Sequence, residues 1–243
     1  MTYQTAVITQ QGGRLYNEDS LGHFVLDEGF GCWVVADGLG GHGGGDVASK
    51  LAVEKMLAGF KDRPQITSDL LNELFEEAQI AIIAQQKVTL TLNEMQTTGV
   101  VLLVAGNEAL WGHVGDSRLY YFSGGKLQKQ TSDHSVPQLL VKAGEIGLSD
   151  IRFHEDRNRL LRSIGGSESV KPFIEKQAIE IQSGDAFLLC TDGFWEYVFE
   201  DEMVSDLIDS DTAEQWLKLL VQRLQSRAPE NNDNYSAITI KVS

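Results

Sequence analysis

Residues 32–49, with the sequence CWVVADGLGGHGGGDVAS, place an acidic side chain between an apolar run and a glycine-rich loop. The run 32–36 is typical of a buried strand, and it is followed directly by Asp37. Glycines dominate residues 38–45, and helical spacing resumes at about Asp46. A carboxylate at a strand end, beside exposed main-chain groups, is suited to holding a hard cation. An Asp-Gly turn before a helix would give the same local pattern, so the stretch needs support from elsewhere in the chain.

The size and charge of the chain limit its function classes. At 243 residues and 42% apolar content, the sequence can bury the core of a single domain spanning residues 1–243. Its formal charge of −15 argues against a nucleic-acid partner or an anionic membrane partner. No run is long and apolar enough to span a membrane, and no signal peptide is visible at the N-terminus. Cys32 and Cys190 lie in apolar runs, which favours buried reduced thiols and a cytoplasmic location. Nothing in the sequence demands more than a monomer.

Strand patterns and helix patterns occur in separate blocks. Strands are predicted at 2–10, 21–26, 31–36, 99–105, 109–114, 118–122, 126–130, 186–190 and 235–242. Helices are predicted at 49–60, at 69–87 with Ser68 as the N-cap, and at 136–143, 201–208 and 212–224. This order indicates an α+β protein, and two antiparallel sheets with helices outside would accommodate it.

Acidic residues recur at the ends of the predicted strands. Asp37, Asp116 and Asp192 follow apolar strands, Asp233 precedes the last strand, and Glu18-Asp19 lies in a loop before another. Carboxylates that converge at one edge of stacked sheets would repel one another strongly unless a cation neutralised them. All-oxygen ligands favour Mg²⁺ or Mn²⁺ over zinc.

A pair of divalent ions beside a water molecule is suited to in-line attack on phosphorus. Such a site also needs a cation for the phosphate oxygens, and Arg14 is the candidate because guanidinium binds phosphate through two parallel hydrogen bonds. A surface arginine is the alternative interpretation of Arg14. Arg118 and Arg162 are expected to form structural ion pairs.

Seven short motifs occur in order along the chain: Arg14-x-x-Asn17-Glu18-Asp19, Asp37-Gly38-Leu39-Gly40-Gly41-His42, Thr98-Gly99, Gly112-x-x-Gly115-Asp116-Ser117-Arg118, Asp133-His134-Ser135, Cys190-Thr191-Asp192-Gly193 and Asp233-Asn234. In sequence and order they resemble the motifs of one known family, the metal-dependent serine/threonine protein phosphatases (PPM, or type 2C). The chain resembles the stand-alone bacterial members of that family over nearly its whole length. The resemblance implies a central antiparallel β-sandwich flanked by pairs of helices, with a flap at about 136–169 near the active site.

The resemblance also implies metal ligands. Asp37 would bridge two Mn²⁺ or Mg²⁺ ions, and the Gly38 carbonyl would bind one of them. The other implied ligands are Asp192 and Asp233, with Glu18 and Asp19 binding directly or through water, and Asp116 for a third, weaker metal.

Three further roles concern the substrate and the ligands' orientation. Arg14 matches the phosphate-binding arginine, and Asn234 would orient Asp233 or a water. His42 would protonate the leaving group, because Leu39 occupies the place where many eukaryotic relatives carry a histidine. A structural role in the glycine-rich loop is the alternative for His42, and His134 is expected to anchor a loop.

The function implied is hydrolysis of phosphoserine and phosphothreonine in proteins, in one step, by a water that two metals activate. The substrates would be phosphoproteins of a cognate bacterial serine/threonine kinase, with type VI secretion as one possible setting. A non-catalytic phosphoprotein-binding regulatory domain on the same fold is the alternative. A calcium-stabilised binding module is disfavoured, because the sequence lacks a twelve-residue loop of alternating oxygen ligands.

Overall fold

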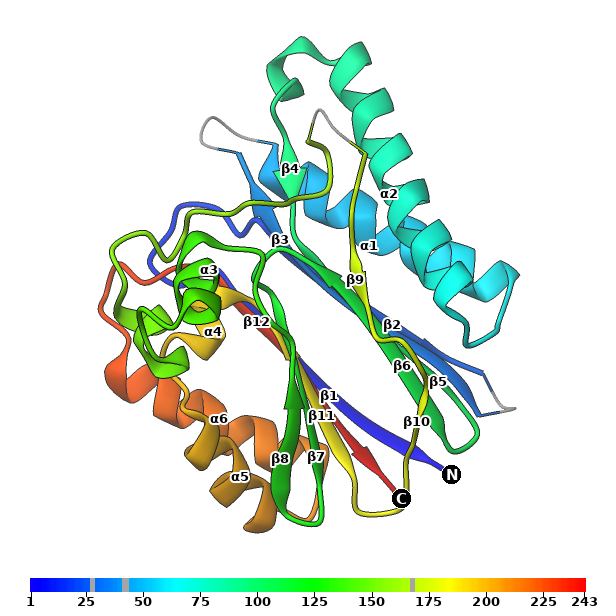
Figure 1. Ribbon diagram of the computed structural model, residues 1–243, viewed down its shortest axis with the longest axis vertical. Helices are drawn as coiled ribbons and strands as arrows, with labels where there is room; N and C mark the ends of the chain where they lie inside the picture. The colour runs from blue at the N-terminus through cyan, green and yellow to red at the C-terminus, as the bar shows by residue number, and fades with distance from the viewer. Residues whose placement is uncertain (27–28, 41–43, 167–168) are drawn as a thin grey trace.

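Two antiparallel β-sheets pack face to face in the computed structural model, and helices cover both outer faces (Figure 1). The structure describes residues 1–26, 29–40, 44–166 and 169–243. The predicted α+β sandwich with flanking helices is confirmed.

Each sheet contains strands from distant parts of the chain. The first sheet runs in the order β1 (Tyr3–Gln10), β12 (Tyr235–Val242), β11 (Ala186–Cys190), β7 (Arg118–Ser123) and β8 (Lys126–Gln130). The second runs β10 (Ile179–Glu180), β6 (Glu108–Val114), β5 (Gly99–Ala105), β3 (Phe30–Leu39) and β2 (Asp19–Val25). Two short strands extend it, because β4 (Gln96–Thr97) pairs with β3 and β9 (Phe173–Ile174) pairs with β6.

A pair of helices covers each outer face. α1 (Gly45–Asp62) and α2 (Ser68–Val88) lie over the second sheet, and α5 (Glu200–Ile208) and α6 (Ala213–Arg227) lie over the first (Figure 1). The short α4 (Asp192–Trp195) follows β11, α3 (Val136–Ala143) follows β8, and 3₁₀ turns occur at Leu90–Leu92 and Leu148–Phe153.

Strand alternation explains the layers. In β3, Cys32 and Val34 pack under α1 and α2, while Trp33 points into the space between the sheets. In β11, Leu188 packs toward α5 and α6, while Phe187 faces the other sheet. Successive side chains of a strand point to opposite faces, so these continuous apolar runs fill three layers at once. Both cysteines are buried and free, as predicted.

Several element boundaries differ from the sequence prediction. Thr67, and not Ser68, is the N-cap of α2, since its hydroxyl accepts a hydrogen bond of 3.1 Å from the N–H of Leu70. β3 continues past residue 36 to Leu39, because β4 pairs with it and places Gly38 opposite Thr97. α1 begins at Gly45, four residues before the predicted start, and α4 was not predicted.

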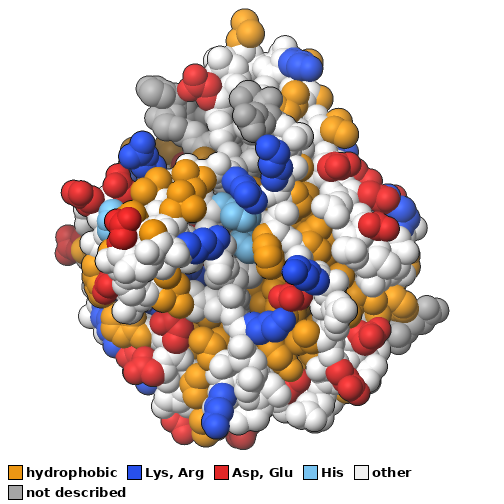
Figure 2. All heavy atoms as spheres, in the orientation of Figure 1, with side chains coloured by type: hydrophobic (Ala, Val, Ile, Leu, Met, Phe, Trp, Pro, Cys, Tyr) orange, Lys and Arg blue, Asp and Glu red, His pale blue; other side chains and the backbone are white. Residues whose placement is uncertain are grey.

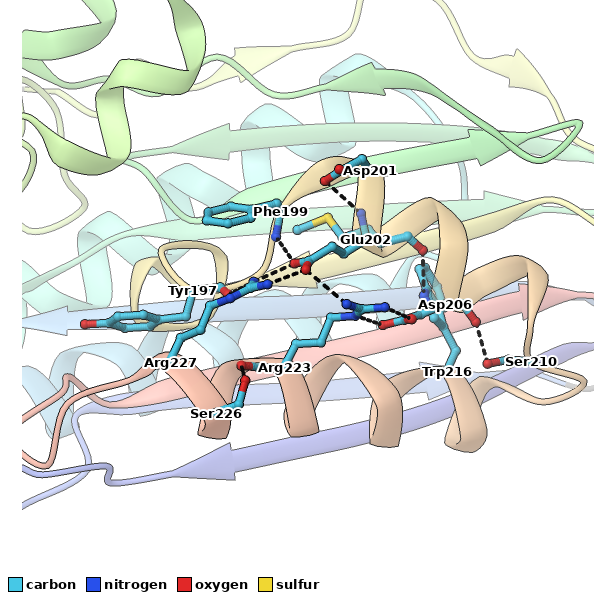
Figure 3. A network of polar contacts seen from close by, with 11 residues as sticks. Tyr197, Phe199, Asp201, Glu202, Asp206, Ser210, Trp216, Arg223, Ser226 and Arg227 are labelled. Carbon is cyan, nitrogen blue, oxygen red and sulfur yellow. Dashed lines mark hydrogen bonds and ion pairs between the residues drawn. The ribbon is translucent and has the colours of Figure 1, made fainter.

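Ion pairs connect the two helices on the first sheet (Figure 3). Arg223 of α6 donates two hydrogen bonds to Asp206 of α5, at 2.6 and 2.7 Å. Glu202 of α5 accepts hydrogen bonds from both Arg223 and Arg227. The two helices are therefore held in register by charged groups as well as by apolar packing.

Over the part of the chain that the structure describes, no helix combines the length and apolarity required to cross a bilayer.

Candidate active site

Acidic side chains from distant segments line one pocket of about 780 Å³. The five acidic residues come from the loop before β2, from β3, from the loop after β6, from the start of α4 and from the loop before β12: Glu18, Asp37, Asp116, Asp192 and Asp233. Arg14, Gly38 and Asn234 line the same pocket. The convergence predicted from the strand ends is therefore present in the fold. His42 lies outside the described residues.

Two threonines fix the backbone of Asp37. The N–H of Asp37 donates to the Thr98 hydroxyl at 2.9 Å, and the Asp37 carbonyl accepts from the Thr98 N–H at 2.8 Å. The hydroxyl of Thr97 donates to the same carbonyl at 2.8 Å. Asp37 is thereby held rigidly at the pocket wall, although it lies within a strand and not in a loop.

Close backbone approach explains the glycine after Asp37. A Cβ added to Gly38 would lie 2.1 Å from the carbonyl oxygen of Gly45 and 2.5 Å from that of Glu18. Any side chain here would force the start of α1 away from β3, so only glycine fits. The Glu18 carboxylate in turn accepts a hydrogen bond from the N–H of Gly45. Burial nevertheless raises the pKa of Glu18 above its usual value, with the charge of Asp46 adding to the effect.

The loop before β12 is tied to the N-terminal loop by Asn234. Its side-chain amide donates to the carbonyls of Gln11 and Tyr16 at 2.8 Å each, and its Oδ1 accepts from the N–H of Glu18 at 2.8 Å. The main-chain N–H of Asn234 donates to the Asp233 carboxylate at 2.9 Å. Asn234 thus orients Asp233 through the backbone, while its side chain joins two loops.

Asp19 is buried next to the pocket residues. Its Oδ2 accepts a hydrogen bond of 2.9 Å from the Thr191 hydroxyl, one position before Asp192. Its Oδ1 is buried and has no hydrogen-bond partner among the described residues. A buried carboxylate oxygen without a donor is costly unless a cation or a water satisfies it.

The electrostatics of the cluster fit a cation. Burial, reinforced by neighbouring carboxylates, raises the pKa of Asp192 to about 7 and that of Asp19 to about 8. The same causes raise the pKa of Asp37 and of Asp116 well above the usual value. The group therefore holds protons that a divalent ion would displace.

In the described ranges, no three acidic, histidine or cysteine side chains lie close enough together to bind one ion at the same time. Pocket carboxylates spaced in this way still suit Mg²⁺ or Mn²⁺, because Mg²⁺ is usually held by one or two carboxylates and keeps several waters. The donors that face the pocket are carboxylates and the Gly38 main chain, and their all-oxygen chemistry matches these hard ions.

A buried ion pair supports the segment of Asp116. Arg118 donates to both carboxylate oxygens of Asp133, at 2.8 and 2.7 Å, and its guanidinium lies 3.5 Å from the ring centroid of Trp195. The indole N–H of Trp195 donates to the carbonyl of Asp116 at 3.0 Å. The ion pair expected for Arg118 is confirmed, and it holds the backbone that carries Asp116.

The segment 136–169, predicted as a flap, contributes two pocket residues that the sequence did not single out. Asn158 and Leu160 line the pocket, and Arg157 fixes the segment by donating to Glu196 at 2.6 Å. Residues 154–160 carry no helical or strand periodicity, so the sequence gives no signal for their position. The hydrogen bond between Arg157 and Glu196, which places them at the pocket, is apparent only in the structure.

Comparisons with known proteins agree with this site. The model of the protein phosphatase 2C family matches residues 10–234. The serine/threonine phosphatase Stp of Listeria monocytogenes is 31% identical over 224 residues, which cover 90% of this chain and 88% of Stp.

Solved structures agree as well. The phosphatase PstP/Ppp of Mycobacterium tuberculosis superposes with a TM-score of 0.86 at 29% identity and covers 100% of both chains. The catalytic domain of a serine/threonine protein phosphatase PstP in complex with two manganese ions superposes with a TM-score of 0.81, at 29% identity over 98% of this chain and 97% of that one. PppA, a key regulatory component of T6SS in Pseudomonas aeruginosa, gives 0.74 at 28% identity, over 99% and 98%.

Family motifs, carboxylate pocket and sandwich thus agree over nearly the whole length, and the chain belongs to the protein phosphatase 2C family of serine/threonine phosphatases.

Proposed function

We propose that this chain hydrolyses phosphoserine and phosphothreonine in proteins, with the 780 Å³ pocket as its active site. The observation that carries the proposal is the convergence of five acidic side chains and Arg14 in that pocket. A non-catalytic phosphoprotein-binding domain on this fold would not need the complete carboxylate set. Each acidic residue that the resemblance implies as a metal ligand lies in or beside the pocket.

Two Mn²⁺ or Mg²⁺ ions would be held by the pocket carboxylates. Asp37 and the Gly38 carbonyl would hold one ion, Asp37, Asp192 and Asp233 the other, and Glu18 and Asp19 would support them directly or through water. Asp116 would hold a third, weaker ion. When bound, such ions supply an activated water and neutralise the charge of the phosphate oxygens.

The protein's own groups bind and orient the phosphate. Arg14 stands at the pocket wall with 55% of its side chain exposed, and Asp233 holds its guanidinium at 2.7 Å. One edge of the guanidinium is thereby fixed, and its remaining N–H groups can bind phosphate oxygens in two parallel hydrogen bonds. Protonation of the leaving serine oxygen by His42 stays a prediction.

The wider biological setting is part of the same proposal. Residues 1–243 would form one catalytic domain acting as a monomer in the cytoplasm, where Cys32 and Cys190 stay reduced. A cognate serine/threonine kinase would produce its phosphoprotein substrates. The similarity to PppA supports type VI secretion as one setting to test.

Manganese-dependent hydrolysis tests the proposal directly. The purified chain should hydrolyse p-nitrophenyl phosphate and a phosphoserine peptide in Mn²⁺, and both activities should disappear in EDTA. Asp192→Asn should lose both while keeping the wild-type circular dichroism spectrum. A folded wild-type chain that hydrolyses neither ester in Mn²⁺ or Mg²⁺ would leave only the binding interpretation.

A further inference from the structure

Cationic side chains gather beside the proposed active site, although the chain as a whole carries a formal charge of −15. Figure 2 shows blue lysine and arginine side chains around pale-blue histidines on this face. A cavity of about 540 Å³ opens here between β6 and β8, and His134 and Lys142 line it. A second groove of about 470 Å³, which Arg162 lines, lies next to it.

The hydrogen bonds of His134 determine which ring nitrogen carries the proton. Nδ1 of His134 accepts a hydrogen bond of 3.2 Å from the N–H of Gly115. Burial, reinforced by His113, Arg162 and Lys142, lowers the pKa of His134 to about 3, so the ring is neutral at pH 7. A neutral imidazole that accepts at Nδ1 carries its proton on Nε2.

Two donors therefore lie close together, and the described residues place no acceptor between them. Nε2 of His134, which carries the proton, lies 3.4 Å from Nη1 of Arg162, and every guanidinium nitrogen is a donor. Arg162 is held in place because Nη1 also donates to the Lys171 carbonyl at 3.1 Å. Converging N–H groups that lack an acceptor form a binding site for an oxyanion.

A second histidine, His113, packs against His134 and fixes the orientation of its ring. His113 stacks on His134 with ring centroids 4.7 Å apart and an angle of 7° between planes. Its Nε2 lies 2.8 Å from the carbonyl of Ser132, and its buried Nδ1 has no hydrogen-bond partner among the described residues. The stack fixes the His134 ring, so the Nε2–H direction is preset.

The donor pair is within reach of the active-site pocket. Leu160 and Leu39 line both the active-site pocket and the groove that contains Arg162. Arg162 follows Leu160 by two residues, so their Cα atoms lie at most about 7 Å apart. An extended peptide advances about 3.3 Å per residue, so a side chain two or three residues from the scissile phosphoserine can reach Arg162.

We propose that His134 and Arg162, with Lys142 nearby, bind a second anionic side chain of the phosphoprotein substrate. The preferred substrate class is a segment that carries a phosphorylated or acidic residue two or three positions from the phosphoserine that is hydrolysed. This inference rests on the proposed phosphatase function and adds its substrate preference. Arg162 is a specificity residue here and takes no part in the chemistry.

Matched peptides test the subsite. One phosphoserine peptide has neutral flanks, and its partners carry glutamate or a second phosphoserine at positions −3, −2, +2 or +3. The wild-type kcat/KM should be about five- to tenfold higher for at least one peptide with a second anionic side chain than for the neutral peptide. This is the size expected for charge-assisted hydrogen bonds at a partly exposed site. The advantage should shrink with added NaCl, because salt screens exposed charges.

Arg162→Met should abolish the advantage while leaving turnover of p-nitrophenyl phosphate and of the neutral peptide at wild-type levels. Arg162→Lys should keep part of it, and Lys218→Met on α6 should keep all of it. Equal kcat/KM values for all peptides with the wild type, or an unchanged preference in Arg162→Met, would overturn the subsite. Failure of the phosphatase function would look different, since even p-nitrophenyl phosphate would then remain intact.

Discussion

Arg14 donates a hydrogen bond of 2.7 Å to the carboxylate of Asp233, a residue 219 positions away in the chain. The two side chains are 55% and 33% exposed, so the ion pair adds little to stability. Its consequence is geometric, because it holds a guanidinium beside the carboxylates that would bind the metals. A phosphate that enters the pocket meets this cation already oriented.

Removing Arg14 should damage substrate binding more than folding. Arg14→Ala should lower kcat/KM for a phosphopeptide by about ten- to a hundredfold, or roughly 1.4–2.8 kcal/mol. Its free energy of unfolding should change by less than about 1 kcal/mol, as for other exposed ion pairs. Steady-state kinetics and urea unfolding measure the two effects, and Lys218→Ala is the control. An unchanged kcat/KM would exclude Arg14 from phosphate binding.

The buried pair of Arg118 and Asp133 should be a major stability determinant. Both side chains are at most 2% exposed, and the contact has two hydrogen bonds. Arg118→Ala would leave Asp133 buried without a partner, and it should cost about 3–5 kcal/mol in urea unfolding. Arg63→Ala, which breaks partly exposed pairs with Glu73 and Glu77, should cost much less. Equal costs for the two variants would contradict the role of burial.

The raised carboxylate pKa values predict an unusual pH dependence for the metal-free protein. Asp19 titrates near pH 8 when folded and near 3.8 in an unfolded chain, so the folded state binds more protons between these values. Its contribution to stability is therefore lost as pH rises through 8. In EDTA, the urea midpoint should fall between pH 7 and 8.5, a window above the titration of unfolded histidines at about 6.5.

Manganese should reverse this trend, because the ion replaces the protons that the carboxylates hold. The stabilisation by Mn²⁺ should accordingly grow between pH 7 and 8.5, and Asp19→Asn should flatten the fall in the metal-free protein. A metal-free midpoint that rises over this window would show that the folded protein does not hold extra protons on its buried carboxylates.

The ion pairs between α5 and α6 should make the free energy of unfolding depend on pH at low pH (Figure 3). Hydrogen bonds from Arg227 and Arg223 lower the pKa of Glu202 to about 2, and the Glu202 side chain is only 14% exposed. Its stabilisation is complete above about 4.5 and is lost as pH falls toward 2. Glu202→Gln should cost about 2 kcal/mol at pH 7, as for hydrogen bonds to charged groups, and progressively less below pH 4.5. Glu214→Gln, on the exposed side of α6, should change stability little at either pH.

The central strands could be predicted from the sequence because they are buried on both faces. Residues 99–105 and 186–190 were predicted with the bounds that the structure shows, since each is a continuous apolar run. Helix 136–143 was predicted correctly as well, because Pro137 lies at its start and Gly144 follows its end. Where the local residue pattern and the tertiary packing favour the same structure, the sequence is sufficient to predict the bounds of an element.

The errors arose where a distant segment decides the local structure. β3 continues through Asp37, which lies opposite Asp19 of β2, and on to Leu39, because β4 pairs with it at Gly38 opposite Thr97. The pocket residues Asn158 and Leu160 lie in an irregular segment, and the contact of Arg157 with Glu196 places it. Family motifs located the carboxylates, but the facing donors of His134 and Arg162 emerge only from three-dimensional geometry.

The central claim is that carboxylates far apart in the sequence share divalent ions in one pocket, and calorimetric titration of the metal-free chain with MnCl₂ tests it most directly. Wild type should bind at least two Mn²⁺ ions per chain and release protons. Asp37→Asn and Asp192→Asn should each bind fewer, and the surface variant Asp62→Asn should match wild type. A folded wild-type chain that takes up no Mn²⁺, or an Asp37→Asn variant that binds as many ions as wild type, would contradict the account.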